Sequence, residues 1–82
     1  MSGWVDLPAD VRELVERTLA DYPLQLEAWR LREEGRSWRT IALVQGVSRP
    51  TVRERVEAAD LRLSKAGLRQ NAHGRYSIKA TA

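Results

Sequence analysis

Arginine side chains recur at one-turn spacing in the middle of the chain. Arg36 and Arg39 precede a short apolar stretch, and Arg49 and Arg53 follow it. A guanidinium group carries a permanent charge and a fork of N–H donors, so it can bind phosphate oxygens or pair with the O6 and N7 acceptors of guanine. The alternative is a solvated surface side chain, or for Arg53 a pair with Glu57 one turn later. These residue types and spacings indicate recognition of an anionic partner.

Bond-making chemistry has no support in the sequence. The chain contains no cysteine, which excludes a thiol nucleophile, a disulfide and a cysteine-bound metal. The single histidine, His73, stands in a turn-like run beside Gly74, where we expect a solvated loop side chain. Because there is also no phosphate-cradling glycine loop, nucleophile–base pair or ligand cluster, we expect no enzyme activity, no metal and no cofactor, and no small-molecule ligand is evident.

Length and charge distribution indicate one small domain with two electrostatic halves. A chain of 82 residues buries only about 60% of the surface that its unfolded form exposes, which argues against a large enclosed active site. Residues 1–34 have a net charge of −4, whereas residues 35–82 have a net charge of +7. This asymmetry suggests an acidic supporting half and a basic working half.

No apolar run approaches the roughly 20 residues of a membrane span and no signal peptide is visible, so we expect a cytoplasmic protein without membrane contact.

Apolar residues follow helical spacing through four segments of residues 1–67. The first series runs from Val11 to Tyr22, after a start marked by Asp6 and Pro8, and it ends before Pro23, which can open the second helix. The inward faces that the spacing predicts for the later helices are Leu24, Ala28 and Leu31 for the second, Trp38, Ile41 and Ala42 for the third, and Val52, Val56, Ala59, Leu63 and Ala66 for the fourth.

Polar caps and glycines mark the ends of these helices. Ser37 and Ser48 are expected to cap the third and fourth helices, because a serine oxygen accepts hydrogen bonds from free N–H groups of the first turn. Gly35, Gly46 and Gly67 are the expected stops of the second, third and fourth helices. The predicted fold is therefore an all-α, four-helix domain over residues 1–67.

Residues 68–82 have a different pattern. Residues 68–70 and 75–78 could be two short strands around a turn-like tetrapeptide, residues 71–74. An isolated hairpin is marginal in water, so such a hairpin would have to pack on the helices as a wing. A disordered basic tail is the alternative reading of this segment.

The stretch from Gly35 to Val56 resembles the helix-turn-helix of bacterial and phage DNA-binding proteins. It is similar in particular to the homeodomain-like type found in resolvase/invertase DNA-binding domains, small terminase subunits and sigma-factor region 4. The resemblance covers about residues 24–66, with the motif itself over residues 37–63. The residues that carry it are Ile41-Ala42, then Gly46-Val47-Ser48, then Thr51-Val52 and Val56.

One residue departs from the pattern of this family. Such motifs usually carry an apolar residue just before the turn glycine, whereas this chain has Gln45 before Gly46. We expect Leu43 or Val44 to fill the missing apolar volume through a slight rotation of the third helix.

The resemblance implies a role for each polar residue of the motif. The fourth helix would enter the major groove of double-stranded DNA, and the third would cross the backbone. Glu54 could either accept from a cytosine amino group or repel phosphate, and Trp38 is expected in the core, with stacking on a sugar as the alternative. The implied base-facing residues are Ser48, Arg49, Pro50, Arg53 and Glu54, and the implied backbone-facing residues are Arg36, Ser37, Arg39, Thr40, Thr51 and Arg55. Outside the motif, the tail residues Arg69, Arg75 and Lys79 could follow the DNA backbone or enter the minor groove, with a charged solvated tail as the alternative.

The function that the resemblance implies is sequence-specific binding of double-stranded DNA by a small bacterial or phage transcription regulator. A recombination or DNA-packaging accessory module, excisionase-like or terminase-like, is an alternative within the same class. A protein-interaction module such as an anti-repressor, working through the acidic first two helices, is the alternative from another class. A homodimer through the first helix and Trp29 is an open alternative, and Trp29 could instead cover the seam between the first two helices.

Overall fold

The computed structural model of the chain describes residues 3–70 and 75–78. A short 3-10 turn, η1 (Trp4–Asp6), is followed by four helices and two strands. The helices are α1 (Ala9–Thr18), α2 (Pro23–Glu33), α3 (Trp38–Gln45) and α4 (Arg49–Lys65). The strands β1 (Leu68–Gln70) and β2 (Tyr76–Ile78) pair antiparallel, with Leu68 opposite Ile78. The predicted four-helix fold is confirmed, together with the C-terminal hairpin.

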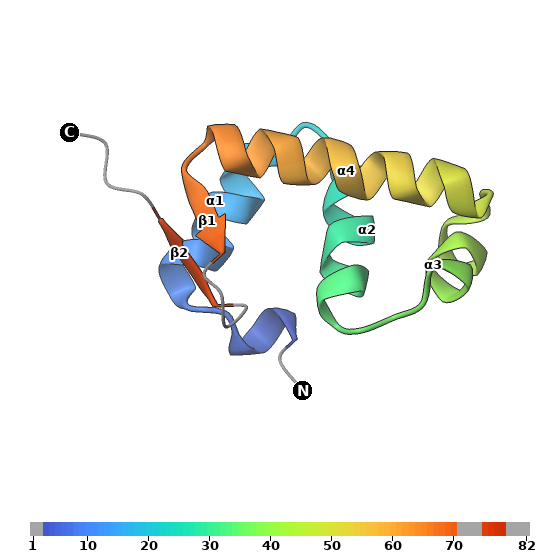
Figure 1. Cartoon of the computed structure of the whole chain (residues 1–82), viewed down its shortest axis with the longest axis horizontal. Helices are drawn as coiled ribbons and strands as arrows, with labels where there is room; N and C mark the ends of the chain where they lie inside the picture. The colour runs from blue at the N-terminus through green and yellow to red at the C-terminus, as the bar shows by residue number, and fades with distance from the viewer. Residues whose placement is uncertain (1–2, 71–74, 79–82) are drawn as a thin grey trace.

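The long helix α4 runs across the whole molecule and organises the other elements (Figure 1). In this view α2 crosses beneath the middle of α4, while α3 lies at the end where α4 begins. Helix α1 and the hairpin lie at the opposite end, where α4 finishes. The third helix and the first turns of α4 therefore form one end of the molecule by themselves.

Two of the predicted apolar faces need correction. Leu24 is 52% exposed. Helix α2 places Trp29 in the core, and a residue five positions earlier lies about 140° away around the helix, so Leu24 faces solvent. Ala66 caps the end of α4 and is exposed. Helix α1 also stops earlier than predicted, at Thr18, since the N–H of Tyr22 donates to the carbonyl of Leu19 in a turn that leads into α2. The remaining predicted face of α4, residues 52, 56, 59 and 63, is buried.

The hairpin is held against the helices by a cluster of aromatic and acidic side chains. Trp29 is 1% exposed; its Nε1 donates to Asp60 at 2.9 Å, and its ring lies 5.8 Å from that of Tyr76. The Tyr76 hydroxyl donates to Glu33 at 2.6 Å. Desolvation raises the pKa of Glu33, and burial together with this hydrogen bond raises the pKa of Tyr76. These contacts and the burial of Leu68 dock the two strands as a wing.

The buried position of Trp29 also bears on self-association. The indole packs edge-on against Trp4, with the ring centroids 6.4 Å apart, so it belongs to the core. The interpretation of Trp29 as a half-exposed oligomer contact is therefore wrong, whereas a homodimer through other surfaces stays a prediction.

The turn between α3 and α4 depends on a left-handed residue. Gly46 has φ 66° and ψ 34°, and Val47 donates back to the carbonyl of Ala42 to close the helix end. An added Cβ at Gly46 would meet no atom within 4 Å, so a substitution there costs backbone strain and no steric clash.

We expect Gly46→Val to lower the free energy of unfolding by about 1–2 kcal/mol, because a left-handed backbone is costly for residues with a Cβ. In a domain of this size each kcal/mol corresponds to about 4–8 °C in Tm, which thermal unfolding would register. Gly46→Asn is the matched control, since asparagine enters the left-handed region more readily, and it should lose clearly less. Equal melting temperatures for wild type and Gly46→Val would contradict this account of the turn.

Candidate nucleic-acid interface

Both motif helices begin with the same serine cap. The Ser37 oxygen accepts from the Thr40 N–H at 3.1 Å, and the two hydroxyls lie 2.9 Å apart. The Ser48 oxygen accepts from the Thr51 N–H at 3.4 Å, with the two hydroxyls 3.0 Å apart. Each Ser-x-x-Thr pair satisfies a free donor and sets the residue at which its helix starts. These caps confirm the predicted beginnings of α3 and α4.

A groove runs between the first turns of these two helices. Its volume is about 440 Å³. A second hollow of about 530 Å³ adjoins it toward the turn and shares Arg39, Arg49 and Pro50 in its wall. The residues that line the first groove are Ser37, Trp38, Arg39, Arg49, Pro50 and Arg53. The fold thus brings predicted base-facing and predicted backbone-facing residues to one surface.

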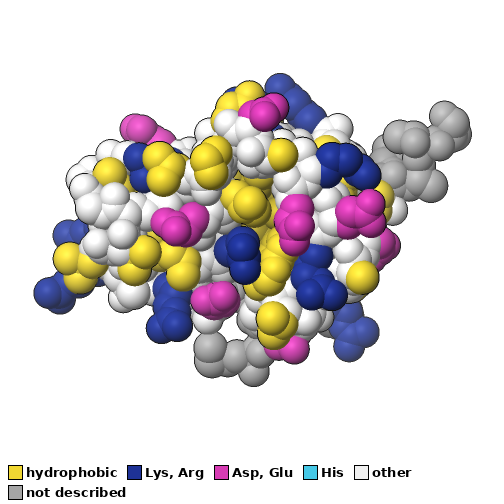
Figure 2. Space-filling model, turned by 180° about the vertical axis from the view of Figure 1, so that it is seen from behind, with side chains coloured by type: hydrophobic (Ala, Val, Ile, Leu, Met, Phe, Trp, Pro, Cys, Tyr) yellow, Lys and Arg dark blue, Asp and Glu magenta, His cyan; other side chains and the backbone are white. Residues whose placement is uncertain are grey.

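The charge on this surface is positive. The residues that line the groove include Arg39, Arg49 and Arg53 and no acidic residue. The side chains of Arg39 and Arg49 are exposed, and within the described part of the chain they make no hydrogen bond or ion pair. Figure 2 shows Lys and Arg side chains projecting from its left end, where α3 and the start of α4 lie. Such a surface favours an anionic partner.

Arg53 is held beside the groove by Trp38. The guanidinium carbon of Arg53 lies 5.3 Å from the centre of the Trp38 ring, a cation–π arrangement. The predicted alternative, a pair between Arg53 and Glu57, is not formed in the structure. Trp38 itself is half-buried, since it packs against the core as predicted but leaves part of its ring in the groove. Glu54 is exposed on the neighbouring surface of α4.

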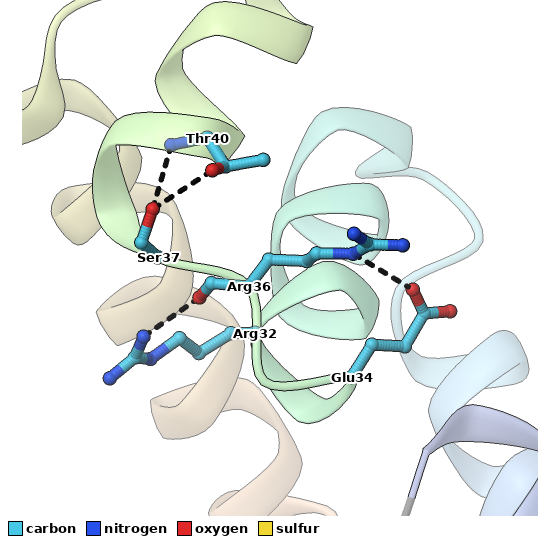
Figure 3. Close-up of polar contacts among 5 residues, drawn as sticks. All are labelled: Arg32, Glu34, Arg36, Ser37 and Thr40. Atoms are coloured by element: carbon cyan, nitrogen blue, oxygen red, sulfur yellow. Dashed lines mark hydrogen bonds and ion pairs between the residues drawn. The ribbon is translucent and has the colours of Figure 1, made fainter.

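Several predicted contact residues lie away from the groove. The Arg36 side chain extends toward Glu34, with its Nε 3.9 Å from a carboxylate oxygen, and points away from Ser37 (Figure 3). Arg69 folds back to donate to the carbonyl of Ser64 at 2.8 Å. Arg69 and the exposed Arg75 belong to the hairpin end of the molecule, opposite α3 in Figure 1. Lys79 lies outside the described residues.

Gln45 forms a polar link between three helices. Its Nε2 donates to the Leu24 carbonyl at 2.9 Å and to a Glu27 carboxylate oxygen at 3.1 Å, both on α2. Its Oε1 accepts from an Nη atom of Arg55, on α4, at 2.8 Å. The link explains a polar residue at a position where an apolar one is usual, and it assigns to Arg55 a contact within the protein.

The expectation that Leu43 or Val44 fills the apolar volume beside Gln45 is wrong. Leu43 is 73% exposed and Val44 is 57% exposed. The amide of Gln45 fills that position itself, and its hydrogen bonds satisfy the polar atoms there. No rotation of α3 is needed, because Ile41 and Ala42 already face the core.

Neither a metal site nor a membrane span is found in the described residues. Residues 3–70 and 75–78 contain no group of three histidine or acidic side chains that could hold a metal ion. No helix in the same part of the chain is long and apolar enough to cross a membrane.

In comparisons with known proteins, no family model, no curated protein and no solved structure matches this chain.

Proposed function

We propose that this chain binds double-stranded DNA, with α4 in the major groove and α3 across the backbone, and that it acts as a small bacterial or phage transcription regulator in the cytoplasm. The geometric support is a pair of serine-capped helices joined by a three-residue turn, residues 46–48, with a left-handed glycine at its start. The two helices lie at one end of the molecule, where a duplex can approach them without meeting the hairpin.

The observation that carries the proposal is the concentration of exposed arginine side chains without an ion pair in the described residues at the starts of the two helices. Arg39 stands on α3, which would cross the backbone, while Arg49 and Arg53 stand on the first two turns of α4. In helix-turn-helix docking, this part of the second helix faces base edges and the first helix faces phosphates. Arg49 and Arg53 are therefore assigned to guanine recognition, and Arg39 to a phosphate.

The size of the interface sets a limit on specificity. A single module of this kind buries about 600–1,000 Å² of protein surface. Selective binding then calls for a second copy on an adjoining half-site or for tandem sites. Selection of bound duplexes from a random pool identifies the site, and a single site or an inverted repeat in the result reports the stoichiometry.

Trp38 provides a direct test of where DNA binds. Of the three tryptophans, Trp4 and Trp29 are buried at 6% and 1% exposure, whereas Trp38 is half-buried in the groove. We expect duplex DNA at low salt to reduce the quenching of tryptophan fluorescence by acrylamide, because the duplex covers the Trp38 ring. A mobility shift of the same duplex would follow binding independently of the fluorescence.

The matched control is Trp38→Phe, which keeps an aromatic ring in the groove. Its quenching should be low without DNA and should not change when DNA is added, since its two tryptophans are buried. A mobility shift with unchanged quenching in the wild type would mean that DNA binds elsewhere on the surface. Absence of any shift at low salt would favour a protein-interaction module.

A further inference from the structure

Arg32, on the last turn of α2, lies next to the groove although it falls outside the helix-turn-helix motif. Its guanidinium carbon is 4.2 Å from the centre of the Trp38 ring, and one Nη donates to the carbonyl of Arg36 at 2.8 Å. These two contacts fix the planar head of an otherwise exposed side chain. Arg32 therefore presents a preorganised charge at the start of α3.

The charge of Arg32 continues the positive surface of the groove. Arg53 lies over the same tryptophan ring at 5.3 Å, so the two guanidinium carbons are less than about 10 Å apart. A DNA strand carries one phosphate for about every 3.4 Å of helix axis. If Arg53 enters the major groove, a cation at this distance lies within reach of the phosphates at the edge of that groove.

Arg36 has the opposite geometry, although its position in the sequence fits the motif better. Figure 3 shows its side chain extending away from Ser37 and toward Glu34, whereas Arg32 lies on the Ser37 side of the connection. The Glu34 carboxylate partly neutralises Arg36, and no ion pair of Arg32 is formed within the described residues. Sequence position favours Arg36 for a contact beside the start of α3, whereas the geometry favours Arg32.

We propose that Arg32, and not Arg36, supplies the phosphate-binding cation beside the start of α3, positioned by stacking on Trp38. This inference rests on the proposed DNA-binding function and adds a specific residue to it. A planar guanidinium held by its stacking and by one hydrogen bond retains further N–H donors for a phosphate oxygen. Little side-chain entropy remains to be lost when that phosphate binds.

The test compares Arg32→Gln with Arg36→Gln in duplex binding measured over a series of salt concentrations. Both variants remove one positive charge, so they change the overall field of the protein equally. Glutamine at position 32 keeps an N–H donor for the carbonyl of Arg36, which protects the local fold. We expect Arg32→Gln to reduce the salt slope, log K against log salt, by about 0.9, the value for one phosphate contact, and Arg36→Gln to leave it unchanged.

A third variant separates charge from conformation. Arg32→Lys keeps the charge and should keep the wild-type slope, but it loses the planar group that stacks on Trp38 and should bind the duplex more weakly. Equal slopes for Arg32→Gln and wild type, or equal losses of slope in Arg32→Gln and Arg36→Gln, would each overturn the assignment of Arg32. In both outcomes the wild type still binds DNA in a salt-dependent manner. A wild type that binds no duplex would overturn the proposed function, and the assignment with it.

Discussion

Affinity for duplex DNA should fall about 10-fold when salt is raised from 50 to 200 mM. Two exposed arginines are assigned to phosphates, Arg39 on α3 and Arg32 beside its start, whereas Arg49 and Arg53 are assigned to bases. Each neutralised phosphate releases condensed counterions, so that log K falls with log salt by about 0.9 per contact. Two contacts over a fourfold change in salt give a loss of about one order of magnitude.

Fluorescence anisotropy of a labelled duplex over this range of salt would measure the loss. Arg17→Gln is a matched control, because Arg17 lies on α1, at the hairpin end of the molecule, in an exposed pair with Glu13 at 3.8 Å. This variant removes the same charge from a surface that would not meet DNA, and its salt slope should equal that of the wild type. Affinity that is constant between 50 and 200 mM salt would exclude a phosphate-binding face.

The parts of the interface that were predictable from the sequence are those set by local interactions. Ser37 and Ser48 cap the helices through groups three residues away, and Gly46 closes α3 through its own backbone conformation. Such signals depend on neighbours within one turn, so a single sequence contains all the information that they need. Both ends of α3 and the start of α4 followed from them.

Contacts between distant segments could not be read from the sequence. The bond from Trp29 to Asp60 joins residues 31 positions apart, and that from Tyr76 to Glu33 joins residues 43 positions apart. These contacts decide between a docked wing and a free tail, two forms that the composition of residues 68–82 allows equally. The link from Gln45 to α2 and α4 is similar, because an isolated glutamine gives no sign of its partners.

The direction of exposed side chains was the other limit on prediction. Arg32 and Arg36 are one helical turn apart in sequence spacing, yet the Schellman-like end of α2 at Gly35, with φ 85°, changes the course of the backbone between them. Arg32 consequently stacks on Trp38, and Arg36 extends toward Glu34. Sequence spacing shows that two arginines lie on either side of Gly35. It does not show which of the two side chains points toward the groove.

Replacing Arg53 with alanine should weaken binding to the preferred site by about 1–3 kcal/mol, or about 5- to 150-fold in Kd. Arg53 is on the second turn of α4, held over Trp38 at the edge of the groove, where a bidentate contact to guanine is possible. The loss of such a contact also relaxes the preference at one base pair. Binding to a scrambled duplex should change much less, since that duplex lacks the matching guanine.

Arg39→Ala is the counterpart on α3. Arg39 is exposed at the start of the helix that would cross the backbone, and no side chain of the described residues holds it. A phosphate contact carries no sequence information, so its loss should weaken preferred and scrambled duplexes by the same factor. The salt slope should decrease by about one unit on both.

The central claim is that α4 contacts bases while α3 contacts the DNA backbone. Its most direct test is to measure binding of wild type, Arg53→Ala and Arg39→Ala to preferred and scrambled duplexes at two salt concentrations. The account predicts that Arg53→Ala reduces the ratio of the two affinities, and that Arg39→Ala leaves the ratio intact while lowering both affinities and the salt slope. An unchanged ratio in Arg53→Ala together with an altered base preference in Arg39→Ala would contradict it, because α3 would then be the helix in the major groove.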